Sequence, residues 1–232
     1  MEARDFVLVQ GLRDTRATLE RWNARPGPVL WSWLAGSLAV VAALLLAVWG
    51  VALLSSPDPS GLAVPGLNRP PSLQAVGSVL FRNSLVLALH AMACVAGFIA
   101  GSSLPLQATR YNGVWRRVHD RAGPLAIGFV VCATTFSLCT QAFVLGGAAS
   151  TLAAQLHITP GLLLVGLLPH ALPELTALFL PLAAWIIASR RGEWDQLLAA
   201  TFVTVGIAVP VLVVSAFVEV YASPHLLRAL AA

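Results

Sequence analysis

Five apolar stretches dominate this sequence, and each is long enough to cross a lipid bilayer as a helix. A crossing helix needs about 20 consecutive apolar residues, because the hydrocarbon core is about 30 Å thick. Within lipid, only helices and closed barrels satisfy their own backbone hydrogen bonds, and stretches of this length favour helices. The sequence therefore predicts an all-α, polytopic membrane helical bundle of about five transmembrane helices. They cover residues 30–54, 80–104, 123–148, 160–189 and 196–221.

The charged residues are few and lie mostly outside the apolar stretches. Of the 232 residues, 58% are hydrophobic and only 10% are charged, whereas soluble domains carry about a quarter of charged residues. All 14 basic residues are arginines, and they lie in short segments between the apolar stretches. They form no basic domain, so nucleic acid is not expected as a partner.

The arginines also predict an orientation. Eleven of them fall before the first stretch, after the second and after the fourth, while the remaining segments carry only Arg69, Arg82 and Arg228. The eleven are Arg4, Arg13, Arg16, Arg21, Arg25, Arg110, Arg116, Arg117, Arg121, Arg190 and Arg191. Because positive charge marks the cytoplasmic loops, we expect a cytoplasmic amino terminus and an external carboxyl terminus.

Four further segments complete the predicted organisation. The amino-terminal segment has helical spacing until Pro26 and Pro28, and we expect a short interfacial helix there, on the cytoplasmic side. The first apolar stretch is interpreted as a retained anchor rather than a signal peptide, because it is long and follows several charged residues. We expect residues 1–29 to form the cytoplasmic segment, 30–54 the first anchor, 55–79 an irregular external loop rich in Pro, Gly and Ser, and 226–232 a tail.

The fourth apolar stretch contains the sequence Pro-His-x-x-Pro-Glu. It is about 45 Å long as one helix, more than the bilayer needs. Thr159 and Pro160 form a start signal, a capping hydroxyl followed by a proline at the first helical position. Pro169 and Pro173 each remove a backbone donor, so we expect the helix to be broken between residues 168 and 171.

Polar side chains within the apolar stretches are the candidate functional residues. His170 and Glu174 are four apart and share a helix face, whereas Asn83 and His90 are seven apart on another helix. Glu219 lies near the end of the last stretch. In the predicted topology all five fall in the outer half or the middle of the membrane, which predicts a polar pocket that opens outward. Two roles stay open, either hydrogen bonding between helices or direct binding of a substrate or partner.

Gly97 continues the helix face that carries Asn83 and His90. Gly97 and Gly101 form a small-xxx-small pair. Such pairs allow two membrane helices to approach closely, so we expect a neighbouring helix to pack there.

Four motifs in order carry a family resemblance over residues 80–225. They are LFRNSLVLALHAMACVAGFIAG with Asn83, RYNGVW with Asn112 and Gly113, LLPHALPEL with Pro169 and Pro173, and AFVEVYASP, which ends at Pro224. This region resembles the stage II sporulation protein M family of bacterial membrane proteins. The chain has Ala171 where that family typically has glycine after the Pro-His pair.

The resemblance implies a multi-pass protein of the bacterial inner membrane that has no known enzymatic activity. In spore formers the namesake works with two peptidoglycan-degrading proteins during engulfment. We therefore expect a scaffold that recruits or positions partner proteins in a cell-envelope or peptidoglycan-remodelling context. Its expected partners are the lipid bilayer and other membrane or envelope proteins, a homodimer is left open, and no cofactor or metal is expected. Sporulation itself is not carried over, because lysine-free sequences are untypical of low-GC spore formers.

Two alternatives come from the polar residues. A broken helix beside a carboxylate is typical of transport sites, so the chain could be the membrane subunit of a transporter or permease. Alternatively His170, Glu174, His90 and Glu219 could hold a metal ion in an intramembrane hydrolase. The metalloprotease signature of two histidines flanking a glutamate is absent from the sequence, so we assign no catalytic residue.

Overall fold

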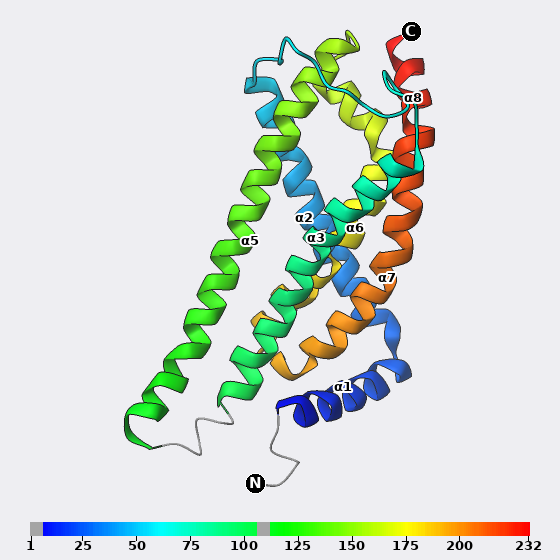
Figure 1. The fold of residues 1–232 in the computed structure, drawn as a ribbon. Coiled ribbons are helices and arrows are strands. Elements are labelled where there is room, and N and C mark those ends of the chain that lie inside the picture. The colour runs from blue at the N-terminus through cyan, green and yellow to red at the C-terminus, as the bar shows by residue number, and fades with distance from the viewer. Residues whose placement is uncertain (1–6, 106–111) are drawn as a thin grey trace. The chain divides into compact units, whose positions relative to one another are not determined.

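The computed structural model describes residues 7–105 and 112–232, and within these ranges it contains helices and no strand. Five helical segments are long and apolar enough to cross a membrane, so the predicted all-α membrane fold is confirmed. The α-helices are α1 (Val7–Ala24), α2 (Pro26–Leu54), α3 (Leu73–Phe98), α5 (Gly113–Gln155), α6 (Pro160–Arg191), α7 (Leu197–Phe217) and α8 (Ser223–Ala231) (Figure 1). Short π-helical or 3-10 segments join them, namely η2 (Ile99–Ser103), η3 (Trp194–Gln196) and η4 (Val218–Ala222).

The chain divides into two compact units. Unit 1 comprises the chain up to Ser37, Leu87–Thr134 and Phe179–Ile207. Unit 2 comprises Leu38–Val86, Thr135–Leu178 and Ala208–Ala232.

The amino-terminal helix is present, and the first membrane helix starts earlier than predicted. α1 ends at Ala24, and α2 begins at Pro26 rather than at residue 30. Proline is well tolerated in the first turn, where its missing N–H would have no helical partner. Pro26 and Pro28 therefore start α2, in addition to separating it from α1.

The loop predicted over residues 55–79 is shorter than expected, because α3 begins at Leu73. The Ser72 hydroxyl accepts a hydrogen bond from the Ala75 N–H at 3.2 Å, which is the geometry of an N-cap. Gln74, Gly77 and Ser78 lower the hydropathy of this first part of α3, so the apolar pattern alone placed the helix start too late. The predicted tail is also largely helical, because α8 continues to Ala231.

The predicted break in the fourth helix is wrong, because α6 is helical without interruption from Pro160 to Arg191. Its start is as expected, since the Thr159 hydroxyl accepts a hydrogen bond from the Leu162 N–H at 3.2 Å. Pro169 and Pro173 each cost one backbone hydrogen bond, about 3 kcal/mol in an isolated helix. α6 is also the most buried of the five membrane helices, because 61% of its apolar 18-residue stretch lies inside the protein. Tertiary packing of this helix outweighs the local preference of its prolines.

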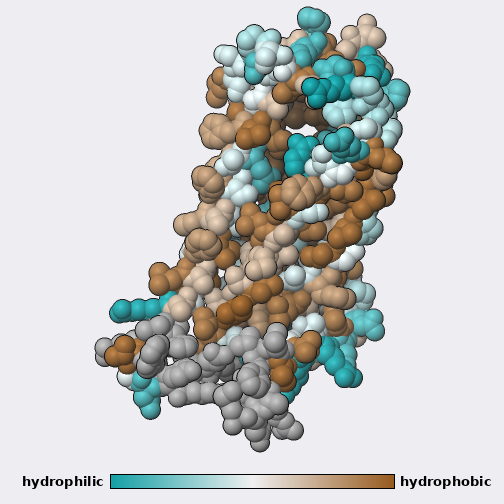
Figure 2. Space-filling model, viewed as in Figure 1, coloured by the Kyte–Doolittle hydropathy of each residue, from teal (hydrophilic) through white to brown (hydrophobic). Residues whose placement is uncertain are grey.

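Large apolar side chains remain exposed along the membrane helices (Figure 2). On α5, the side chains of Phe129, Phe136 and Phe143 are each between 69% and 74% exposed. Only 17% of the apolar 18-residue stretch of this helix is buried. Soluble proteins rarely expose apolar surface on this scale. The exposed faces therefore form a lipid-facing surface.

We expect glycine at position 157 to stabilise the protein. His157 has φ +56°, a left-handed conformation that favours glycine, and it follows α5 in a Schellman turn closed by the Ile158 N–H on the Ala153 carbonyl at 3.0 Å. Removing the Cβ strain in His157→Gly should raise the free energy of unfolding by about 1 kcal/mol, measured by thermal unfolding in detergent. Gly192, with φ +70° after α6, provides a control in the opposite direction. Gly192→Ala introduces the same strain, so it should lower the free energy of unfolding by a similar amount. If both variants shift in the same direction, the strain argument is contradicted.

We also expect acid to loosen the turn that follows α2. The Ser60 hydroxyl and N–H both donate to Asp58 Oδ1, at 2.7 and 2.8 Å, and hold the pKa of Asp58 below its ordinary value of 3.8. Because the folded pKa is the lower one, the stabilisation is present above the unfolded pKa and is lost as pH falls through the folded value. The rate at which pepsin cleaves the wild-type loop, divided by the rate for Asp58→Asn, should therefore start below one and rise toward one as the pH falls from about 5 to about 2. A rate ratio that stays constant over this range would contradict the prediction, and the ratio cancels the pH dependence of pepsin itself.

Candidate functional site

Unit 2 brings three of the five predicted polar residues together. The Asn83 side chain on α3 faces the Glu174 carboxyl on α6, and Glu219 in η4 lies within electrostatic reach of Glu174. Arg82 lies within electrostatic reach of both carboxyls. We call Arg82, Asn83, Glu174 and Glu219 the carboxylate cluster.

The carboxylate cluster is incompletely satisfied. Asn83, Glu174 and Glu219 are half-buried, and Arg82 is exposed. Within the described part of the chain, the buried atoms Asn83 Nδ2 and Glu174 Oε2 complete no well-aligned hydrogen bond, although the two side chains lie within hydrogen-bonding range of each other. Each such atom costs about 1–3 kcal/mol, because it has lost water and gained no partner.

His170 takes a different position in the same unit. It is only 7% exposed, and its Nδ1 lies 2.6 Å from the hydroxyl of Ser223, the first residue of α8, which is also buried. Which atom donates depends on the tautomer of the imidazole. This hydrogen bond therefore connects α6 to α8, and it holds the two helices together.

Glu219 lies in a π-helical turn, where the chain contains one extra residue relative to an α-helix. Such turns are uncommon, and they occur often at functional sites. Beside it, the rings of Phe217 and Tyr221 stack with their centroids 6.2 Å apart. The π turn thus presents a carboxylate and an exposed aromatic pair from one short segment.

His90 belongs to unit 1 rather than to the unit that holds the other four residues. Its side chain is fully buried, and its ring packs edge-on against Phe179, with the centroids 5.2 Å apart. The seven-residue spacing from Asn83 placed both residues on one helix face, but α3 passes from unit 2 into unit 1 after Val86.

The predicted glycines lie against bulky neighbours in unit 1. A Cβ on Gly97 would lie 2.7 Å from Leu197 and 2.8 Å from the Trp185 ring nitrogen, and a Cβ on Gly101 would overlap the ring of Trp194. Close approach of neighbouring helices thus requires glycine at both positions.

The remaining motif residues have local structural roles. Gly113 has φ +64° where α5 begins, and Asn112 before it is exposed. Pro224 lies in the first turn of α8. Arg4, Arg110 and Tyr111 lie outside the described residues.

Metal binding finds no support in the arrangement of side chains. Among the side chains that the structure describes, those of residues 9–105, 112–114 and 121–232, no three His, Cys, Asp or Glu converge closely enough to hold a metal ion. The hydrolase alternative needs such a set, with His170 and Glu174 among its members.

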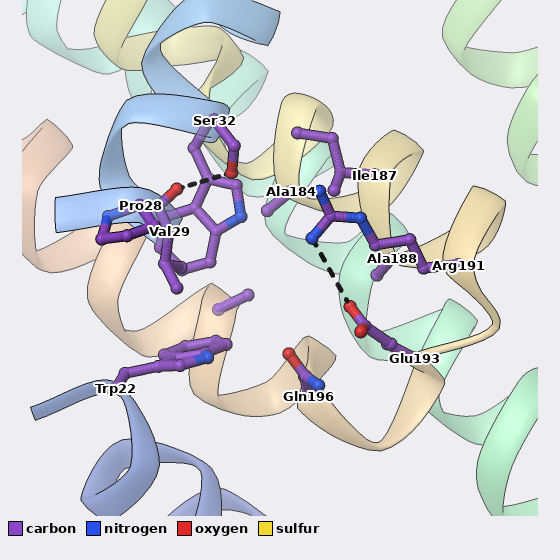
Figure 3. Close-up of a pocket in the computed structure, with 12 residues that line it drawn as sticks. Trp22, Pro28, Val29, Ser32, Ala184, Ile187, Ala188, Arg191, Glu193 and Gln196 are labelled. Carbon is purple, nitrogen blue, oxygen red and sulfur yellow. Dashed lines mark hydrogen bonds and ion pairs between the residues drawn. The ribbon is translucent and has the colours of Figure 1, made fainter. Parts of the chain in front are cut away.

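Unit 1 contains a cavity of about 160 Å³ that the sequence did not indicate (Figure 3). Trp22 of α1 lies on one side, and Arg191 and Glu193, which form an ion pair at 4.0 Å, lie on the other. Ser32 and Gln196 add polar groups to its wall. A second cavity of about 440 Å³ adjoins it and shares Trp22, Val29 and Trp33.

Sequence reasoning missed two members of the polar groups in unit 2. Arg82 directly precedes Asn83, and its position near the amino-terminal end of an apolar stretch was a signal for a carboxylate partner. Ser223 is the serine of the AFVEVYASP motif, but serine is too common in membrane helices to stand out. The cavity residues gave no signal, because they come from segments more than 150 residues apart.

These features define the class of the protein as a multi-pass, all-helical membrane protein with a half-buried carboxylate cluster between three helical segments. Residues 122–224 match the family model described as Stage II sporulation protein M, so this part of the chain is similar to that family. The match contains His170, Glu174 and Glu219. Comparisons with curated proteins and with solved structures gave no match.

The family match is shorter than the region over which the sequence resembles the family. It begins at residue 122, so two of the four motifs, those containing Asn83 and Asn112, lie outside it. The motifs around His170 and Pro224 lie within it.

Proposed function

We propose that the protein is a non-enzymatic membrane scaffold that recruits or positions partner proteins, with the carboxylate cluster as its recognition site. The observation that supports this role is the pair of buried atoms, Asn83 Nδ2 and Glu174 Oε2, which complete no well-aligned hydrogen bond within the described residues. Both atoms are buried, so a polar side chain or a backbone group from another membrane helix would reach them only as the surrounding helical segments part. Inside a membrane such groups are retained at an energetic cost, and a binding role accounts for that cost.

The proposed setting follows from the family and from the arginine distribution. We place the protein in a bacterial inner membrane, with a cytoplasmic amino terminus, an external carboxyl terminus and a role in the cell envelope or in peptidoglycan remodelling. Its proposed partners are the surrounding lipid and other membrane or envelope proteins. A second copy of the chain is a further candidate for the same cluster. The proposal includes no nucleic acid, cofactor, metal or catalysed reaction.

The transport alternative has lost the feature on which it rested. It required a fourth helix that breaks beside Glu174, as transporters often break helices around a bound substrate. α6 passes this point as a continuous helix. The scaffold is therefore the better-supported function.

A site-specific crosslink tests the scaffold. A photo-reactive residue at Tyr221, which is 39% exposed and two residues from Glu219, is introduced in cells and activated in native membranes. Wild type should yield a defined crosslinked partner, and Glu174→Gln should lose it while keeping its thermal unfolding midpoint. Glu20→Gln, which removes an exposed carboxylate paired with Arg16, is the matched control and should keep the partner.

Two outcomes would reject the scaffold. One is the same partner captured equally by wild type and by Glu174→Gln. The other is the absence of any crosslinked protein, a second copy included, from wild-type membranes.

A further inference from the structure

The two adjoining cavities of unit 1 differ in character. The smaller one has charged and polar side chains in its wall, including Arg191, Glu193 and Gln196. The larger one is lined mainly by apolar side chains such as Leu19, Leu30 and Val203, together with the polar side chains of Glu20 and Asn23. We call the smaller cavity the head cavity and the larger one the chain groove.

The same three residues form part of the wall of both cavities. Trp22, Val29 and Trp33 line each of them, and the two indole rings meet edge to face with their centroids 5.0 Å apart. Trp33 is 4% exposed and belongs to a packed core with Ala184 and Ala200, so this wall is firmly held. A polar space and an apolar space that adjoin in this way match a ligand with a polar head and an apolar chain.

The charges of the head cavity identify the kind of head. The cavity wall carries one guanidinium, from Arg191, and one carboxylate, from Glu193, so its charges balance. Balanced charges suit a zwitterion better than an anion, with a phosphate on Arg191 and an ammonium on Glu193. The faces of tryptophan rings also attract a cation, and Trp22 is directed toward the cavity (Figure 3).

The existing ion pair does not prevent such binding. The Arg191 and Glu193 side chains are 60% and 40% exposed, and their nearest charged atoms are 4.0 Å apart. Exposed pairs of this kind contribute little, so a ligand that contacts both charges can replace their mutual contact at small cost.

We propose that unit 1 binds one phospholipid whose head carries both an ammonium and a phosphate, with the head in the head cavity and an acyl chain in the chain groove. Glu193 contacts the ammonium, Arg191 contacts the phosphate, and Trp22 separates the two spaces. The ligand is available wherever the flanking helices α2, α6 and α7 cross a bilayer, because lipid surrounds them. Tryptophan is also the residue type that prefers the level of lipid headgroups.

Lipid retention by the full-length protein tests this site. The protein is purified in detergent, offered phosphatidylethanolamine or phosphatidylglycerol with identical chains, and analysed by native mass spectrometry. Wild type should retain the zwitterionic lipid about tenfold better, a preference equal to about 1.4 kcal/mol. Glu193→Gln should remove this preference, because the amide cannot form a charge-assisted contact with the ammonium.

Trp22→Ala and Trp31→Ala form a matched pair. Trp22 lines both cavities, whereas Trp31 is 70% exposed and belongs to the wall of neither. Retention of phosphatidylethanolamine should fall in Trp22→Ala and stay at the wild-type level in Trp31→Ala. Phosphoethanolamine without chains should bind at least about 100-fold more weakly than the lipid, because it leaves the chain groove empty.

Three results would overturn the proposal. The first is equal retention of the two lipids by wild type, and the second is an unchanged preference in Glu193→Gln. The third is phosphoethanolamine binding as tightly as the lipid, which would identify a soluble ligand instead. None of these results bears on the carboxylate cluster, which lies in unit 2.

Discussion

Replacing Gly66 by alanine should destabilise the protein by about 2–4 kcal/mol and lower its thermal unfolding midpoint by about 5–10 °C. Gly66 has φ +79°, and a Cβ there would lie 2.5 Å from the Val220 carbonyl oxygen and 2.6 Å from the Pro224 ring. The strain of the left-handed conformation adds to this overlap, and neither a backbone carbonyl nor a proline ring can easily move away.

The effect of the Gly66 variant should extend to the carboxylate cluster. Arg228 of α8 donates hydrogen bonds to the Gly66 and Leu67 carbonyls, so this loop holds the carboxyl-terminal helix. Val220 follows Glu219 in the π turn, and its carbonyl oxygen is the atom that a Cβ on residue 66 would strike. Displacement of the loop should therefore move Glu219 and reduce the Tyr221 crosslink together with stability.

Gly77→Ala is the control for this prediction. Gly77 is inside α3, and a Cβ there would have no neighbour within 4 Å. Alanine is favoured over glycine in a helix interior, so this variant should gain up to about 1 kcal/mol. Measurement of both variants in the same detergent separates the local clash from a general intolerance of glycine substitution, which would destabilise both equally.

The helical membrane fold was predictable, because it depends on the length and apolarity of segments rather than on their contacts. Backbone N–H and C=O groups without hydrogen bonds are costly in lipid, so five apolar segments of this length form helices whichever helices they pack against. Helix ends depend on single capping residues, and Ser72, the cap of α3, was overlooked although Thr159 before α6 was recognised.

The state of α6 could not be predicted from its prolines. The rule that proline breaks a helix holds where a lost hydrogen bond is not compensated, as in an exposed helix. In α6, Leu178, Phe179 and Leu182 are each 3% exposed or less, and their burial holds the helix beyond Pro173. A single sequence does not show how deeply a helix will be buried, so local and tertiary preferences could not be weighed against each other.

The candidate site was predictable in its members but only partly in its grouping. Spacing determines which residues share a helix face. The free-energy cost of placing a polar side chain in the membrane identifies Asn83, Glu174 and Glu219 as candidates. Spacing does not determine which faces meet, so the separation of His90 from this group was not foreseen. The hydrogen bond of His170 with Ser223 likewise joins segments 53 residues apart.

Replacing Glu174 by methionine together with Asn83 by leucine should leave stability unchanged or increase it. Both side chains contain a buried atom that completes no well-aligned hydrogen bond within the described residues, and apolar replacements of similar size remove that cost. Loss of Glu174 also removes the repulsion between two neighbouring carboxyls when both are ionised, while Arg82 remains beside Glu219. Thermal and denaturant unfolding in one detergent measure the effect.

His170→Leu gives the contrast within the same unit. It leaves the buried Ser223 hydroxyl without its 2.6 Å partner, so it should lose about 1–3 kcal/mol. If the double variant at Asn83 and Glu174 loses as much as His170→Leu, the carboxylate cluster holds helices together and the scaffold proposal loses its supporting observation. If the double variant is as stable as wild type but no longer crosslinks its partner, the protein keeps these two polar groups at the expense of its own stability. Recognition of a partner is then the role that remains for them, because packing and helix association would both be served better by apolar side chains.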